Sequence, residues 1–131
     1  MNKIPTIFIV DDDKFLLGMY SLKFKKGDFV VESALGSEEA LTRLRAGLRP
    51  DIFLLDIIMP TMTGLELLEK AKKENMVGNA TVVMLTNQGE QSDIDQAKSL
   101  GVQGYIVKAT TIPSEVVEEV SKIYKEHKAQ I

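Results

Sequence analysis

The chain has 131 residues, of which 44% are hydrophobic and 27% are charged, and its formal net charge is −3. This length fits one domain, the composition excludes a disordered chain, and the charge argues against a general nucleic-acid or anionic-membrane binder. The lack of cysteine, the single histidine (His127) and the absence of long apolar runs exclude thiolate and multi-histidine metal sites, disulfide scaffolds and membrane-spanning helices.

Five short apolar runs alternate with segments of helical periodicity. The runs are rich in valine, isoleucine, leucine or phenylalanine, as strands buried on both faces are. They span residues 6–10, 29–33, 51–55, 81–85 and 104–107. We therefore expect an α/β fold with a parallel sheet covered by helices on both faces.

The helical segments lie after each of these runs. In the first, Gly27 is the stop signal, and the apolar residues at roughly helical spacing are Phe15, Leu16, Met19, Leu22 and Phe24. Three more helices are expected at 39–46, 64–74 and 93–100. Pro113 suits the first turn of a last helix, whose apolar stripe runs from Val116 to Tyr124. We expect residues 125–131 to form a frayed tail.

Polar residues end four of the predicted strands. They are Asp11, Asp12 and Asp13 after the first, Asp56 after the third, Thr86 after the fourth and Lys108 after the fifth. Because ligands bind such sheets at the carboxyl ends of the strands, we expect these side chains to converge on one edge. For Asp13 alone, capping of the following helix is the simpler role.

A cluster of carboxylates has few stable chemical states. Two carboxylates about 4 Å apart repel by about 4 kcal/mol at an effective dielectric constant near 20, so the cluster raises a pKa or recruits a cation. Oxygen ligands without nitrogen or sulfur suit Mg²⁺ or Mn²⁺. A carboxylate beside such an ion can attack phosphorus and form an acyl phosphate, while the ion, the lysine and a hydroxyl share the phosphoryl oxygens.

In this order and spacing, the motifs resemble the receiver domain of two-component response regulators. They are Val10-Asp11-Asp12-Asp13, residues 51–60 (DIFLLDIIMP) with Gly64, Thr86, and Gly104-Tyr105-Ile106-Val107-Lys108. The resemblance runs from about residue 3 to residue 124. It implies a flavodoxin-like, doubly wound sheet of five strands in the order 2-1-3-4-5, with five helices, as in stand-alone chemotaxis regulators.

The resemblance also implies roles for individual residues. Asp56 is the expected phosphoacceptor, and Lys108 is expected to pair with it and with the phosphoryl group. The expected Mg²⁺ (or Mn²⁺) ligands are Asp12 directly, Asp11 through water, Asp56 and the backbone carbonyl of Ile58. Thr86 is expected to bind a phosphoryl oxygen, and Tyr105 to be the rotameric switch that follows it inward. Ile58 and Gln88 occupy positions that tune the lifetime of the phosphorylated state.

Two positions depart from the family pattern. Ala109 replaces the usual proline after the lysine, so either a strained cis peptide bond is retained or the loop takes another path. Asn87 replaces a small residue after Thr86, and its side chain could narrow access to Asp56 or donate a hydrogen bond to phosphate.

The implied function is Mg²⁺-dependent acceptance of a phosphoryl group from a histidine kinase or histidine phosphotransfer protein. The switch would then alter the surface of the helix at 93–100, strand 104–107 and the last helix, for a downstream protein target. We expect a cytoplasmic phosphoprotein without nucleic-acid or membrane contact, which is not an enzyme beyond catalysing its own phosphorylation and dephosphorylation. A stand-alone receiver domain over residues 1–131 is expected, with a fragment of a longer regulator or hybrid kinase as the alternative.

Other functions remain open at this point. A haloacid-dehalogenase-type phosphatase would use Asp11 as its nucleophile, because its motif also begins Asp-x-Asp after the first strand. However, no later acid pair is found, and the chain is short for that fold. A pseudo-receiver that binds partners without phosphorylation is a second alternative. A nucleotide-binding flavodoxin-like domain is a third, but the loop after the first strand lacks a glycine-rich phosphate cradle.

Overall fold

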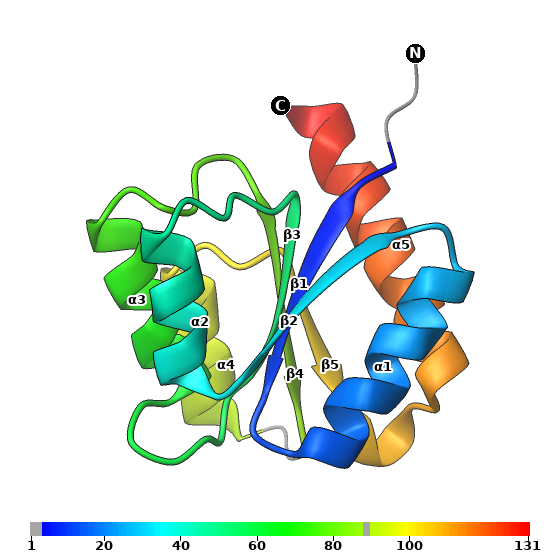
Figure 1. The fold of residues 1–131 in the computed structure, drawn as a ribbon, viewed down its shortest axis with the longest axis horizontal. Coiled ribbons are helices and arrows are strands. Elements are labelled where there is room, and N and C mark those ends of the chain that lie inside the picture. The colour runs from blue at the N-terminus through cyan, green and yellow to red at the C-terminus, as the bar shows by residue number, and fades with distance from the viewer. Residues whose placement is uncertain (1–3, 88–89) are drawn as a thin grey trace.

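A computed structural model describes residues 4–87 and 90–131 as a parallel sheet with helices on both faces (Figure 1). The strands are β1 (Thr6–Asp11), β2 (Val30–Leu35), β3 (Ile52–Asp56), β4 (Thr81–Thr86) and β5 (Gly104–Val107). The helices are α1 (Lys14–Lys26), α2 (Ser37–Arg45), α3 (Gly64–Lys73), α4 (Gln91–Ser99) and α5 (Pro113–Gln130), with a 3-10 turn, η1, at Lys108–Thr110. The strand order is β2-β1-β3-β4-β5, which confirms the predicted flavodoxin-like topology and its five helices.

The sheet separates two apolar cores. Helices α1 and α5 cover one face, and α2, α3 and α4 cover the other (Figure 1). Because neighbouring strand residues point to opposite faces, Ile9 of β1 packs with α1 and α5, whereas Phe8 packs on the opposite side. Strands β3 and β4 are buried along their whole length, as predicted for strands covered on both faces.

The helices that follow β1 and β3, α1 and α3, both begin at residues whose side chains cap them. Asp13 accepts a hydrogen bond from the backbone N–H of Leu16 at 3.1 Å, which confirms the predicted cap of α1. Thr63 and Glu66 form a capping box at the start of α3, each accepting a backbone hydrogen bond from the other. These caps fix where the loops after β1 and β3 end.

The buried face of α1 differs from the predicted one. The helix buries Leu17, Tyr20 and Phe24, whereas Phe15 is 77% exposed and Leu22 is 54% exposed. The sequence of α1 is apolar on most sides, so spacing alone did not single out the face that meets the sheet. Only Phe24 belongs to both the predicted stripe and the buried set.

The last helix is longer than predicted. Helix α5 continues to Gln130, so the expectation of a frayed tail over residues 125–131 is wrong. The Nδ1 atom of His127 lies 2.7 Å from Oγ1 of Thr81, and Thr81 is 1% exposed. The end of α5 is therefore joined to the beginning of β4. Over the described part of the chain, no helix has the combination of length and apolar character that crossing a membrane requires.

Candidate functional site

The register of the strands brings the predicted polar residues together. Val10 of β1 pairs with Leu55 of β3, so the residues that follow them, Asp11 and Asp56, leave adjacent strands at the same level. Thr86 of β4 pairs with Val107 of β5, which places Lys108 just beyond the same edge. The predicted convergence at the carboxyl ends of the strands is confirmed for Asp11, Asp12, Asp56 and Lys108.

Three carboxylates form the centre of the site. Asp11, Asp12 and Asp56 each offer an oxygen within 4.8 Å of the others, and Asp12 is exposed while the other two are buried. An oxygen-only donor set of this kind fits a hard divalent cation such as Mg²⁺, with the exposed side left for water. The donor chemistry therefore agrees with the metal that the sequence predicted.

Lys108 neutralises part of this charge. Its Nζ atom donates to Oδ2 of Asp11 at 2.7 Å and lies 3.5 Å from Oδ2 of Asp56, with all three side chains less than 10% exposed. Burial alone would lower the pKa of Lys108, but the hydrogen bond to Asp11 and the charges of Asp56 and Asp11 outweigh it and raise that pKa. Lys108 is thus a fixed cation, held between the two buried carboxylates.

The proton affinity of Asp56 is clearly perturbed. Burial raises its pKa to about 6, the charge of Lys108 opposes this rise, and the charges of Asp11 and Asp12 add to it. Asp11 has both oxygens engaged, because Oδ1 accepts from the backbone N–H of Asp13 at 2.9 Å and Oδ2 accepts from Lys108. These contacts make Asp11 a poor nucleophile, which counts against the phosphatase alternative.

Two further predicted residues lie at the end of β4 and just after the end of β3. Thr86 is 1% exposed at the end of β4, and Ile58 is 65% exposed in the loop after β3. Both line a cavity of about 380 Å³, together with the exposed Asn87. Gln88, predicted to influence the lifetime of a phosphorylated state, lies outside the described residues.

Tyr105 lies near the start of β5, at the surface between α4 and α5. It is partly buried and packs against the core that α2, α3 and α4 share. Burial raises the pKa of its hydroxyl, and the charges of Asp93 and Glu90 add to the rise. After Lys108 the peptide bond to Ala109 is trans, and η1 follows, so the loop takes the second of the two predicted paths.

Two residues near the site were not singled out by sequence reasoning about chemistry. Gly64 donates its N–H to the carbonyl of Ile57 at 2.8 Å, and a Cβ atom there would lie 1.9 Å from the carbonyl oxygen of Asp56. Tyr20 of α1 is 3% exposed; burial raises the pKa of its hydroxyl, Lys108 opposes this, and Asp11 and Asp56 add to it. The apolar stripe predicted for this helix did not include Tyr20, so nothing in the sequence indicated that it faces charged groups.

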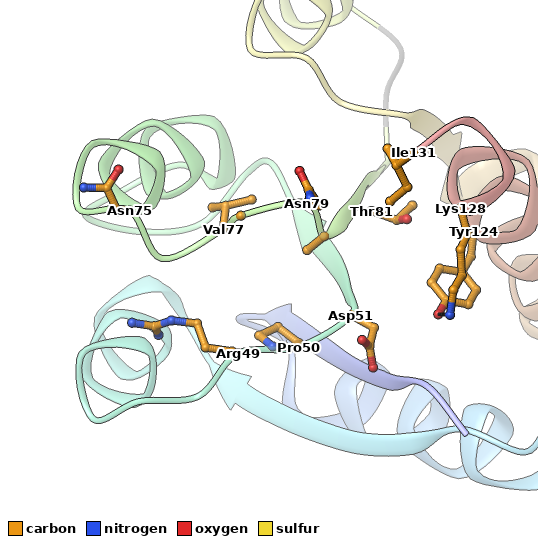
Figure 2. Close-up of a pocket in the computed structure, with 12 residues that line it drawn as sticks. Arg49, Pro50, Asp51, Asn75, Val77, Asn79, Thr81, Tyr124, Lys128 and Ile131 are labelled. Atoms are coloured by element: carbon orange, nitrogen blue, oxygen red, sulfur yellow. Dashed lines mark hydrogen bonds between the residues drawn. The ribbon is translucent and has the colours of Figure 1, made fainter. Parts of the chain in front are cut away.

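A separate cavity of about 370 Å³ lies at the opposite end of the sheet, where β3 and β4 begin. Figure 2 shows Tyr124, Lys128 and Ile131 on one side of it and Arg49, Pro50 and Asp51 below. Asp51 is already used structurally, because its Oδ2 accepts from the N–H of Thr6 at 2.8 Å. The cavity shares no residue with the acidic site, so we assign it no part in the chemistry of that site.

A doubly wound sheet with an acidic cluster and a lysine at its carboxyl edge is the architecture of a receiver domain. The family model of the response regulator receiver domain matches residues 7–121, and the chain belongs to this family. It is 33% identical over 122 residues to response regulator protein VraR of Staphylococcus saprophyticus, an alignment that covers 92% of this chain and 56% of that protein.

Other relatives match over their full length. The chain is 32% identical over 120 residues to chemotaxis protein CheY of Thermotoga maritima, which covers 91% of this chain and 97% of that protein. A CheY-like receiver domain protein from Methanospirillum hungatei superposes with a TM-score of 0.87 at 26% identity, over 98% of this chain and 100% of that one. The chain thus spans about half the length of VraR and nearly all of CheY.

Proposed function

We propose that this receiver domain accepts a phosphoryl group on Asp56 from a phosphohistidine of a histidine kinase or a phosphotransfer protein. The observation that carries the proposal is the buried Asp56 carboxylate, which lies within 4.8 Å of two further carboxylates and 3.5 Å from the Lys108 ammonium. Receiver domains act as phosphoacceptor switches, and this chain has the side chains for that chemistry at matching positions.

The chain's own residues supply most of what the transfer needs. Asp11, Asp12 and Asp56, with the backbone carbonyl of Ile58, would hold Mg²⁺ or Mn²⁺, which supplies charge neutralisation for the phosphoryl oxygens. With a pKa of about 6, Asp56 is mostly ionised at neutral pH and is more basic than an ordinary aspartate. Its carboxylate is therefore both charged and reactive under physiological conditions.

In the transfer, an Asp56 oxygen attacks phosphorus in line with the leaving imidazole. A P–O bond forms, the P–N bond breaks, and its electron pair stays on the histidine nitrogen, which takes up a proton. Lys108 would pair with the phosphoryl oxygens, and Thr86 would donate its hydroxyl to one of them. Hydrolysis of the resulting acyl phosphate would restore Asp56 and release inorganic phosphate.

The output of the switch is proposed for the surface of α4, β5 and α5. Movement of Thr86 toward the phosphoryl group leaves space that Tyr105 can enter from β5. Helix α4 can follow at low cost, because Ala97 is its only buried residue. We propose that residues 1–131 act as one receiver domain and signal through protein contacts, without direct nucleic-acid or membrane binding.

The test is the intact mass of the protein after incubation with acetyl phosphate and Mg²⁺. The wild type and Asp95→Asn, a control in exposed α4, should each gain one phosphoryl group, and Asp56→Asn should gain none. Omission of Mg²⁺ with excess chelator should abolish the gain. A folded wild type that stays unmodified, or an Asp56→Asn protein that is modified, would refute the proposal and favour a pseudo-receiver.

A further inference from the structure

The outer edge of the sheet at β5 has an uneven distribution of charge. Residues 90–122, which include α4, β5 and the first half of α5, contain six acidic residues and three lysines. The chain has 19 acidic and 16 basic residues, so 13 of each lie outside this segment. The segment therefore accounts for the whole net charge of −3. One of its three lysines, Lys108, is already committed to Asp11 in the site.

Two hollows lie side by side along β5, and Tyr105 lines both. The hollow on the α4 side has a volume of about 160 Å³ and is mainly apolar, with Ile94, Ala97 and Val102 in its wall. The hollow on the α5 side has a volume of about 400 Å³, and its wall contains Glu115, Glu118 and Glu119. Because Tyr105 joins them, we treat the two hollows as one groove, with a mainly apolar end that also contains Lys98 and an acidic end.

Little of the negative charge on the three glutamates is neutralised by other residues of the protein. Among the residues that the structure describes, no ion pair involves them, and Glu115 only accepts a backbone hydrogen bond from Ile112. All three are exposed on successive turns of α5. A ligand with lysine or arginine side chains at matching intervals would relieve their mutual repulsion, and an acidic ligand would be repelled.

We propose that this groove binds a basic segment of a partner protein, whose cationic side chains pair with Glu115, Glu118 and Glu119 and whose apolar side chain enters the α4 hollow. The inference rests on the proposed function only in treating this surface as the output face. It adds the charge and shape of the partner. Nucleic acids and anionic membranes do not fit, because the groove repels phosphate.

The probe is a short fluorescein-labelled peptide that alternates lysine and leucine, with a glutamate–leucine peptide for comparison. We expect the basic peptide to bind the wild type by fluorescence anisotropy, more weakly at high salt, and the acidic peptide not to bind. The triple variant Glu115→Gln, Glu118→Gln and Glu119→Gln should bind about tenfold more weakly. Glutamine at position 115 can still accept the hydrogen bond from Ile112, so the helix start is kept.

The matched control removes three negative charges elsewhere, through Glu38→Gln, Glu69→Gln and Glu126→Gln. It should retain the wild-type affinity within about twofold, and amide shifts on peptide addition should map to Gln103, Tyr105 and residues 115–119. Equal loss in both triple variants, or shifts centred on Asp12 and Asp56, would overturn the proposal. The proposal would also be overturned if the wild type self-associates and the triple variant at positions 115, 118 and 119 does not. In that case the groove would bind a second copy of this chain.

The result of the peptide-binding experiment does not depend on whether Asp56 can be phosphorylated. The peptide experiment uses the unmodified protein, so a failure of the acetyl phosphate test leaves the groove binding intact. Conversely, a protein that gains a phosphoryl group but shows no preference for the basic peptide refutes the groove proposal alone.

Discussion

Replacing Asp56 with asparagine should stabilise the fold at neutral and alkaline pH in the absence of divalent cations. The substitution keeps the size and shape of the side chain and removes its charge. In the wild type, burial foremost, together with the charges of Asp11 and Asp12, raises the pKa of Asp56 from 3.8 to about 6 against the opposing effect of Lys108. Ionised Asp56 is therefore less stable in the folded protein than in the unfolded chain.

The size and sign of the effect follow from this shift. One pKa unit corresponds to about 1.4 kcal/mol, so a shift of roughly two units gives about 3 kcal/mol. Below pH 3.8 the carboxyl is protonated in both states, and the penalty is absent. Between the two pKa values the unfolded chain loses its proton first, so wild-type stability falls as pH rises, and above about pH 6 the full penalty is present.

Urea denaturation of both proteins in chelator, from acid to pH 8, measures this difference. The Asp56→Asn protein should be more stable at pH 8 by about 3 kcal/mol, with a melting temperature higher by roughly 10 °C, and the gap should close toward acid pH. Mg²⁺ should narrow the gap by stabilising the wild type. A gap of equal size at pH 4 and pH 8 would refute the electrostatic explanation.

Three further substitutions test separate features. Gly64→Ala should destabilise the fold by about 1–3 kcal/mol in urea denaturation, because its methyl group meets the backbone of Asp56. His127→Ala should cost about 1–3 kcal/mol in the same assay, because the buried hydroxyl of Thr81 loses its partner. Lys108→Met should raise the pKa of Asp56 above about 6, measured by NMR titration of its carboxyl carbon, because the lysine now opposes that rise.

Each of these has a control. Gly18→Ala, in α1 with no atom within 4 Å of the new methyl group, should be neutral or stabilising, and a loss like that of Gly64→Ala would discredit the clash. Lys125→Ala, at an exposed position of α5, is the control for His127→Ala and should leave the stability unchanged. An Asp56 pKa that stays the same in Lys108→Met would show that the lysine does not set it.

The site was predictable from sequence because parallel topology places strand ends on one edge. Asp11, Asp56 and Lys108 each follow an apolar run directly, so no knowledge of packing was needed to bring them together. Which carboxylate Lys108 approaches more closely was not predictable. That depends on the path of a long side chain between two oxygens at 2.7 and 3.5 Å, which spacing does not encode.

The errors in the helices have a different origin. In α1, Phe15 and Leu22 are apolar but exposed, so an apolar pattern wider than one face hid the buried residues Leu17 and Tyr20. In α5, His127 lies four residues after Ile123 and continues its face, yet its polar side chain ended the stripe. Only the position of Thr81 in the folded protein shows why a histidine is accommodated there.

Most surface helices must both pack against the core and present a surface to partners. Helix α4 contributes little to the core, so its sequence is less constrained by folding. Its sole buried side chain is the methyl group of Ala97, so its exposed residues can be replaced with little effect on folding. If α4 belongs to the output surface, as proposed, a descendant can acquire a new target after gene duplication by substitutions in α4 while the acidic centre and both cores stay unchanged. Signalling pathways built on this scaffold can diverge without passing through an unstable intermediate.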